Sequence, residues 1–404
     1  MKVLIVNKFL YPNGGSESYI FGLAQYLTQQ NHTVDFFGMT DQRNVVTNDI
    51  NIGVASVEFK SLSLRKIFYP FKIIYSQEAR KKIRKLIMHI KPDIIHLNNF
   101  NFQITPSILY EIKKHNIPVV MTLHDYQLVC PNHMMYLEHD MKVCEACKGY
   151  KYYSCVKHRC IHNSLIKSVF ASFEGWLYHK LRTYEQLIDA FISPTLFLKN
   201  KFVEFGENPD RIHVLHNFIS LEASLDSSIA KGNYVLYFGR LSAQKGIKTL
   251  LEAAKRSPEV SFKIAGDGDL KESITGSNIE YLGFKSGPEL KKLISEALFT
   301  LYPSEWFENC PMSILESQMY GTPVIGANIG GIPELVEDNI DGLLFEPGDV
   351  EGLIEKIKLL YYNRSLLDSF SKKCLEKIEK FSIKIYYDEL MKIYQTAIKM
   401  HMAN

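Results

Sequence analysis

Short apolar runs alternate with longer stretches of helical period along the first half of the chain. The apolar runs predict buried strands, and the stretches between them predict helices. The predicted strands are residues 2–7, 33–37, 93–97, 119–123, 190–193 and 212–215, and the predicted helices are residues 17–29, 80–90, 104–115 and 196–205. Strands that alternate with helices are typical of a parallel, doubly wound sheet.

The second half of the chain repeats this pattern. Its predicted strands are residues 234–238, 261–265, 279–282, 298–302, 323–327 and 343–345. A chain of 404 residues is too long for one ordinary core, so we expect two domains of similar size. The predicted fold class is therefore α/β, with two Rossmann-like, doubly wound parallel-sheet domains that face a central cleft.

The segment from Glu308 to Glu316 carries the clearest chemical signal. Glu308 follows the apolar run 298–302, Pro311 suits the first turn of a helix and Gly321 suits its end, so Glu316 lies inside that helix. Ligands of open α/β sheets bind beyond the carboxyl ends of the strands, and a helix N-terminus favours an anion such as a diphosphate. One glutamate could contact a sugar and the other a ribose.

This E-x7-E spacing resembles that of the retaining glycosyltransferases of family four, which have the GT-B fold. Similar motifs follow at residues 321–325, 330–336 and 341–349, and one precedes it at residues 237–246. The resemblance extends over nearly the whole chain. It implies an acceptor-side domain at residues 1–219, a linker at 220–232, a nucleotide-sugar domain at 233–380, and a C-terminal helix at 381–404 that crosses back to the first domain.

The resemblance also implies a mechanism and a set of site residues. The acceptor hydroxyl attacks from the face that the diphosphate leaves, the diphosphate accepts the proton, and catalysis requires no metal cofactor. Charge that grows on the leaving group must be neutralised. The implied catalytic residues are Glu308, His124, Arg240 and Lys245, and the implied donor-binding residues are Gly14, Gly15, Arg240, Lys245, Gly266, Phe284, Pro311, Met312, Ser313 and Glu316.

Several of these residues are weak signals when each is taken alone. Gly14 and Gly15 would usually form only a turn, but they follow the first predicted strand, where backbone N–H groups can approach a phosphate. His124 ends the strand 119–123, where it could contact donor or acceptor hydroxyls. The segment Asn309-Cys310-Pro311 replaces the glycine- and phenylalanine-bearing turn that is common in the family, and this leaves the identity of the donor sugar open.

Five of the seven cysteines lie between Cys130 and Cys160, in an insertion at about residues 126–163. Such clustering around a C-x2-C pair favours a structural zinc ion over disulfides. The proposed ligands are Cys130, Cys144, Cys147 and Cys160, with Cys155, His133, His139, His158 and His162 as substitutes. The alternative is a set of unligated thiols.

The net charge of +3 is small, and basic residues are concentrated in the first half of the chain. Residues 65–91 are basic and rich in aromatic side chains, so they could rest on an anionic membrane, or they could form a solvated helix face. Residues 165–178 are amphipathic and could help to hold a lipid-linked acceptor, or they could pack against the first domain. The sequence has no signature of nucleic-acid binding, signal peptide or membrane span. We expect a cytoplasmic protein, either free or peripheral on the inner face of the plasma membrane.

These features predict a retaining glycosyltransferase that moves a sugar from a nucleotide-diphosphate sugar to a glycan or lipid-linked acceptor. Cell-surface polysaccharide or glycolipid biosynthesis is the expected role. Alternatives are a non-catalytic GT-B partner subunit that binds nucleotide or lipid, or another GT-B enzyme such as a sugar epimerase or an inverting transferase. A binding subunit would have no chemical need for all five of Glu308, Glu316, Arg240, Lys245 and His124.

Overall fold

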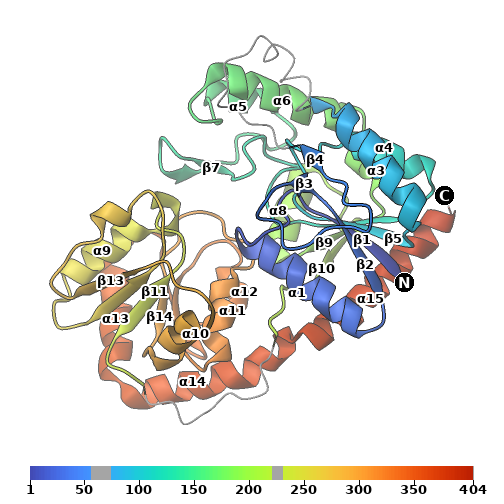
Figure 1. Ribbon diagram of the computed structural model, residues 1–404. Coiled ribbons are helices and arrows are strands. Elements are labelled where there is room, and N and C mark those ends of the chain that lie inside the picture. Colours follow the sequence, from blue (N-terminus) through green and yellow to red (C-terminus); the bar gives the residue numbers. More distant parts are fainter. Residues whose placement is uncertain (56–73, 221–230, 404) are drawn as a thin grey trace.

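The protein consists of two α/β domains that lie side by side (Figure 1). The computed structural model describes residues 1–55, 74–220 and 231–403. Each domain is built on a six-stranded parallel sheet with helices packed on it, which confirms the predicted pair of Rossmann-like domains. Most of the predicted linker, residues 221–230, lies outside the described residues.

The N-terminal sheet has the strand order β10-β9-β6-β5-β1-β2. Its strands are β1 (Lys2–Val6), β2 (Thr33–Phe37), β5 (Ile94–Leu97), β6 (Val119–Thr122), β9 (Ala190–Ser193) and β10 (Ile212–Val214). β1 pairs in parallel with β2 on one side and with β5 on the other. After β1 the chain continues to β2 at one edge of the sheet, and after β5 it continues to β6 in the direction of the other edge. The carboxyl ends of β1 and β5 therefore form the topological switch point, where such sheets bind ligands.

Helices cover both faces of this sheet. The helices of this domain are α1 (Gly15–Gln29), α3 (Gln77–Ile90), α4 (Ser107–Lys114), α5 (Tyr153–Lys157), α6 (Leu165–Lys180), α7 (Thr183–Leu187) and α8 (Leu196–Phe205). The helix predicted from residue 104 begins only at Ser107, because Thr105 has a left-handed backbone, with φ of 68°, immediately before Pro106.

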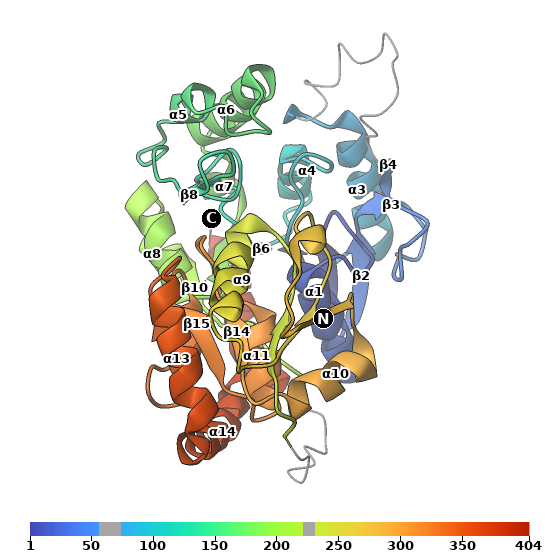
Figure 2. The same cartoon turned by 90° about the vertical axis from the view of Figure 1, so that its left-hand side faces the viewer.

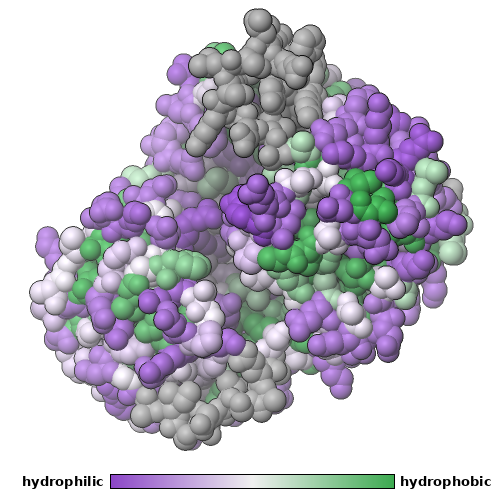
Figure 3. All heavy atoms as spheres, in the orientation of Figure 1, coloured by the Kyte–Doolittle hydropathy of each residue, from purple (hydrophilic) through white to green (hydrophobic). Residues whose placement is uncertain are grey.

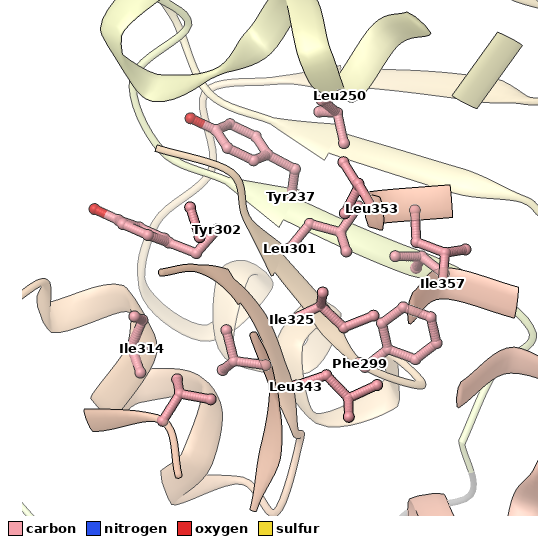
Figure 4. Close-up of a cluster of buried hydrophobic side chains, with 14 of the residues drawn as sticks. Tyr237, Leu250, Phe299, Leu301, Tyr302, Ile314, Ile325, Leu343, Leu353 and Ile357 are labelled. Carbon is pink, nitrogen blue, oxygen red and sulfur yellow. The ribbon is translucent and has the colours of Figure 1, made fainter. Parts of the chain in front are cut away.

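The C-terminal sheet has the order β13-β12-β11-β14-β15-β16, which is the strand order of a dinucleotide-binding fold. Its strands are β11 (Val235–Phe238), β12 (Phe262–Ala265), β13 (Ile279–Gly283), β14 (Thr300–Tyr302), β15 (Val324–Ala327) and β16 (Gly342–Phe345). The helices around it are α9 (Ile247–Lys255), α10 (Gly287–Glu296), α11 (Met312–Met319), α12 (Ile332–Leu335), α13 (Val350–Tyr362) and α14 (Arg364–Ile378). Buried side chains such as Leu301, Ile325 and Leu353 fill the space between sheet and helices (Figure 4).

The last helix, α15 (Ile383–Ala403), returns to the N-terminal domain (Figure 1). Leu390 and Tyr394 of α15 are fully buried in the core beside the first sheet. Ile219 forms an isolated parallel bridge with Ser382, so the two chain segments that pass between the domains lie together. The C-terminal helix therefore contributes to the core of the domain that begins the chain.

The insertion after β6 has structure that the sequence analysis did not predict. A short hairpin joins β7 (Tyr136–Leu137) and β8 (Lys142–Val143), and α5 and α6 follow at the far end of the N-terminal domain (Figure 2). A second small sheet joins β3 (Met39–Thr40) and β4 (Val54–Ala55). Strands of two residues leave no periodicity in a sequence, which explains why they were missed.

Candidate active site

Glu308 lies in the loop between β14 and α11, and its side chain is almost completely buried. The residue is 6% exposed. Its Oε1 atom accepts hydrogen bonds from Lys245 Nζ at 2.5 Å, Ser304 Oγ at 2.8 Å and Trp306 Nε1 at 2.5 Å. Because these three donors converge on one oxygen, Oε2 is the oxygen that remains to accept hydrogen bonds from a ligand.

Lys245 is the cation of this cluster and comes from the turn after β11. Its Nζ also donates to the Tyr302 hydroxyl at 3.0 Å, and it lies 5.4 Å from the ring centroids of both Tyr302 and Trp306. Burial and the Glu308 carboxylate raise the pKa of Tyr302, so its hydroxyl stays protonated. The ammonium and carboxylate groups are thus held as a pair by neutral neighbours.

Two glycines fix the backbone of the Glu308 loop from behind. Gly330 has a left-handed φ of 63°, and a Cβ there would stand 2.4 Å from the carbonyl oxygen of Glu308. A Cβ on Gly331 would stand 2.0 Å from the carbonyl oxygen of Asn309, and the Gly331 N–H donates to Glu308 O at 2.7 Å. Only glycine permits this approach, so the loop position depends on the pair.

The N-termini of two helices meet beside this loop. Pro311 is the N-cap of α11, and Met312 begins the helix. A Cβ on Gly15, the first residue of α1, would lie 3.7 Å from Met312 Cγ. Helix N-termini carry unpaired N–H groups and the positive end of the dipole, so the gap between α1 and α11 favours an anion. Glu17 does not occupy it, since its carboxylate is buried and accepts from Asn7 Nδ2 at 3.0 Å.

His124 follows β6 and faces the Glu308 loop across the domain boundary. Its carbonyl oxygen accepts from Asn309 Nδ2 at 2.7 Å, and its Nε2 lies 2.8 Å from Asn98 Oδ1. Burial lowers the pKa of His124 to about 3, so the imidazole is neutral. Because an amide oxygen only accepts, Nε2 carries the proton and Nδ1 is left as an acceptor.

Further contacts hold the domains together around the hollow that Figure 3 shows between them. The Glu334 carboxylate accepts from the backbone N–H groups of Leu196 at 2.7 Å and Phe197 at 2.6 Å, both at the start of α8. The Tyr126 hydroxyl donates to Phe307 O at 3.3 Å. The site is therefore assembled from both domains.

The other predicted site residues lie around this centre with fewer contacts. Glu316 lies in α11, and burial raises its pKa. Arg240 is exposed after β11, and Phe284 is 73% exposed after β13. Gly266 has φ of 158°, and a Cβ there would stand 1.9 Å from Gly239 O, so it brings two loops together. No contact joins Arg240 or Phe284 to Glu308 within the residues that the structure describes.

Three residues that hold the candidate side chains in place were not predicted from the sequence. Ser304 and Trp306 position Glu308, and Asn98 positions His124. A signal was present for each. Ser304 and Trp306 are polar donors within four residues of Glu308, and Asn98 directly follows β5 at the sheet edge where His124 was placed.

The five clustered cysteines line one small cavity inside the insertion. All are free thiols, and Cys130 Sγ donates to Asn132 Oδ1 at 2.9 Å while burial raises its pKa to about 12. The Cys160 backbone N–H donates to the Cys155 carbonyl oxygen at 3.1 Å. Among the described residues, however, no three His, Cys, Asp or Glu side chains are arranged to hold a metal ion. These thiols do not fit a zinc ion as they stand, so zinc stays a prediction from the sequence.

Comparisons with known proteins agree with this geometry. Residues 13–223 match the family described as Glycosyltransferase Family 4, and residues 226–377 match Glycosyl transferases group 1. An uncharacterized 42.6 kDa protein of the Klebsiella pneumoniae cps region is 25% identical over 83% of this chain and 87% of its own length. A lipopolysaccharide 1,6-galactosyltransferase of Escherichia coli is 24% identical over 53% of this chain and 64% of its own length.

The fold is also similar to that of solved structures. Anabaena Alr3699/HepE in complex with UDP aligns with a TM-score of 0.69 at 17% identity, over 98% of this chain and 100% of the other. None of the helices in the described ranges is long and apolar enough to cross a membrane.

Proposed function

Because the chain belongs to Glycosyltransferase Family 4, a family of retaining enzymes with nucleotide-sugar donors, we propose that it transfers a sugar from a nucleoside-diphosphate sugar to a glycan or lipid-linked acceptor. The observation that carries this proposal is the arrangement of Glu308. All three donors to this buried carboxylate reach Oε1, so Oε2 can accept hydrogen bonds from ligand hydroxyl groups. The nearby cation and the two helix N-termini favour a ligand that also carries negative charge.

In this proposal the donor diphosphate occupies the gap between the first turns of α1 and α11. Lys245 neutralises negative charge on the diphosphate, and the exposed Arg240 binds the diphosphate from the loop after β11. The Glu308 Oε2 atom accepts from hydroxyls of the donor sugar. Glu316 lies four residues after the start of α11 and accepts hydrogen bonds from the ribose diol. UDP is the first candidate nucleotide, since the similar HepE structures contain UDP or UDP-glucose.

The proposed reaction breaks the bond between the anomeric carbon and the diphosphate oxygen. The acceptor oxygen forms the new bond to that carbon on the same face, and its proton passes to the departing phosphate oxygen. His124 is neutral, so it contributes a hydrogen-bond acceptor at Nδ1 rather than a positive charge. It would orient a hydroxyl of the donor sugar or of the acceptor.

We place this activity in the assembly of cell-surface polysaccharide or glycolipid, in the cytoplasm at the inner face of the plasma membrane. The relatives that support this role are the protein of the Klebsiella cps region and the lipopolysaccharide galactosyltransferase. A cytoplasmic enzyme has direct access to nucleotide sugars.

The test is a thermal-shift screen of UDP-, GDP- and ADP-sugars with wild-type protein and the Arg240→Ala variant. One nucleotide class should raise the melting temperature of the wild type, and this shift should shrink in the variant. Arg364→Ala is the matched control. Arg364 is also an exposed arginine, but it donates a hydrogen bond to Asn233, which is not a residue of the proposed site. A shift that survives Arg240→Ala unchanged would contradict the assignment of this arginine, and no shift with any donor would contradict the donor site.

A further inference from the structure

Helix α6 exposes its large apolar side chains. Five of them are between 45% and 70% exposed: Leu165, Ile166, Val169, Phe173 and Trp176. Successive residues of an α-helix are about 100° apart, so these five side chains fall within an arc of about 100° on one face. We call this face the α6 stripe. Within the α6 stripe, the rings of Phe173 and Trp176 are tilted against each other, with their centroids 5.8 Å apart.

The buried side chains of α6 are Ala171, Tyr178 and three polar residues. Ser168 is 0%, Ser172 7% and Glu174 6% exposed. The Ser172 hydroxyl donates to Tyr152 O at 2.9 Å, and the Ser168 hydroxyl accepts from the Ile161 N–H at 3.1 Å. These bonds fix the rotation of α6 against the insertion. The hydrophobic effect disfavours a contiguous row of large apolar side chains in water, so the α6 stripe marks a surface that contacts something apolar.

The surface around the α6 stripe is basic. Between Glu145 and Glu185 the chain has one acidic residue, the buried Glu174. The same segment carries seven exposed basic residues: Lys148, Lys151, Lys157, Arg159, Lys167, Lys180 and Arg182. Lys148 pairs with Glu204, and Arg182 pairs with Glu185. For the other five, the described residues provide no ion pair.

We propose that the α6 stripe docks onto an anionic lipid bilayer, with its aromatic rings in the interfacial region and the flanking lysines against the lipid phosphates. A bilayer offers both an apolar layer and negative charge, so it complements both features of this surface. A second copy of the same surface would satisfy the apolar stripe but would bring basic residues against basic residues.

The membrane contact lies on α6 in this proposal, whereas the sequence predicted it at the basic residues 65–91. Residues 65–73 lie outside the described part of the chain. In α3, Arg80 pairs with Glu111 at 2.8 Å and Lys82 with Glu78 at 2.9 Å. These α3 charges are partly neutralised within the protein, whereas the α6 stripe combines apolar exposure with unpaired lysines.

The docking surface itself rests on exposure and charge, and only its purpose, bringing the active site to a lipid-linked acceptor, rests on the proposed function. The binding test therefore contains no donor and no acceptor. The donor thermal shift, measured without lipid, reports separately on the proposed function.

The experiment is flotation with phosphatidylcholine vesicles that contain or lack about 30 mol% phosphatidylglycerol as the anionic lipid. Wild-type protein should float with the anionic vesicles. The triple variant Ile166→Ser, Phe173→Ser, Trp176→Ser should bind roughly a hundredfold more weakly, as expected when three apolar side chains lose their burial. The control triple variant Val45→Ser, Tyr362→Ser, Met402→Ser removes equally exposed apolar side chains elsewhere and should bind like the wild type. Replacing Lys157, Lys167 or Lys180 with alanine should weaken binding about fivefold each.

Brominated lipid provides a direct readout of insertion. The chain has two tryptophans, and Trp306 lies beside Glu308. Bromine should quench part of the wild-type fluorescence, and Trp176→Phe should remove that part while preserving flotation. Equal flotation of the α6 triple variant, equal binding to neutral vesicles, or no binding by folded wild-type protein would each overturn the proposal. Conversion of a wild-type dimer to a monomer by the α6 triple variant, with vesicle binding unchanged, would assign the stripe to a second copy instead.

Discussion

Glu308 and Glu174 are both buried carboxyl groups, each 6% exposed, but their surroundings differ. Three donors converge on Oε1 of Glu308, one of them the ammonium group of Lys245. Among the described residues, none hydrogen-bonds to Oε1 of Glu174, and burial raises the pKa of this residue to about 8. The first carboxyl is therefore paired with a cation, and the second is held as a neutral acid.

The contrast separates two kinds of buried polar group. Around Glu308, glycines, aromatic rings and donors fix a charge before any ligand arrives, which is the preorganisation that transfer chemistry requires. Around Glu174, α6 buries three polar residues together with Ala171 and Tyr178, and it exposes the apolar side chains of the α6 stripe. An exposed apolar stripe of this size indicates a surface whose natural environment includes something apolar.

The largest effect should come from breaking the pair of Lys245 and Glu308. Lys245→Ala should lower kcat by roughly 10²–10³, because it removes a preorganised cation from the departing diphosphate. Glu308→Gln should lower kcat by a similar factor, since the amide cannot replace the carboxylate as partner of Lys245. Steady-state kinetics provides the measurement. Lys248→Ala, an exposed lysine three residues further on, is the control and should keep wild-type kcat.

The next effect concerns Glu174 and should appear as a pH dependence of stability. Its folded pKa of about 8 lies above the ordinary glutamate value of 4.5, so the folded state holds a proton that the unfolded state releases. The stability that this residue provides is therefore complete below about pH 4.5 and is lost as the pH rises toward 8. Glu174→Gln should remove this slope and raise the free energy of unfolding at pH 7.5, on the order of 3 kcal/mol. Urea unfolding at several pH values measures the free energy of unfolding. If this free energy had the same pH dependence in the wild type and the variant, Glu174 would not be a neutral acid in the folded state.

A pair of glycine substitutions separates backbone strain from steric displacement. Gly330 and Gly348 both have a left-handed φ, of 63° and 76°, but a Cβ on Gly330 would meet Glu308 O at 2.4 Å, whereas a Cβ on Gly348 would meet nothing within 4 Å. Gly348→Ala should cost about 1 kcal/mol of stability and leave kcat unchanged. Gly330→Ala should cost about 2–3 kcal/mol and also lower kcat, because the Glu308 loop must move. Equal effects in chemical denaturation and kinetics would show that the close approach to Glu308 does not matter.

The smallest effect on the protein itself is expected from Arg240→Ala. Arg240 is exposed, so its loss should change the free energy of unfolding by less than about 0.5 kcal/mol. Donor affinity should nevertheless fall by roughly tenfold or more, as expected for the loss of a charge-assisted contact with diphosphate. Isothermal titration with the donor nucleotide tests this, and an unchanged Kd would exclude the arginine from the site.

Much of the fold could be predicted from the sequence, because buried parallel strands are continuous apolar runs. β6 and β15 are examples of such runs, and all six strands of each sheet coincide with predicted runs. The helix predicted from residue 104 began too early because a left-handed Thr105 leaves no mark in the pattern of polar and apolar residues. The hairpin of β7 and β8 was missed because its strands are too short to show a period.

The candidate site was only partly accessible to the same reasoning. The spacing of Glu308 and Glu316 identified a strand-to-helix loop, and the loop does precede α11. The convergence of Ser304 and Trp306 on a single carboxylate oxygen depends on side-chain direction, which the spacing does not specify. The exposure of the α6 stripe was also inaccessible, since an amphipathic pattern shows that two faces differ but not which one is buried.

The most direct test of the central claim is the anomeric configuration of the product, followed by NMR during turnover of the donor that gives the thermal shift. We expect the transferred sugar to keep the configuration of the donor, and we expect Glu308→Gln to bind the donor nucleotide while transfer falls by roughly 10²–10³. An inverted product, or near wild-type transfer by Glu308→Gln, would contradict it.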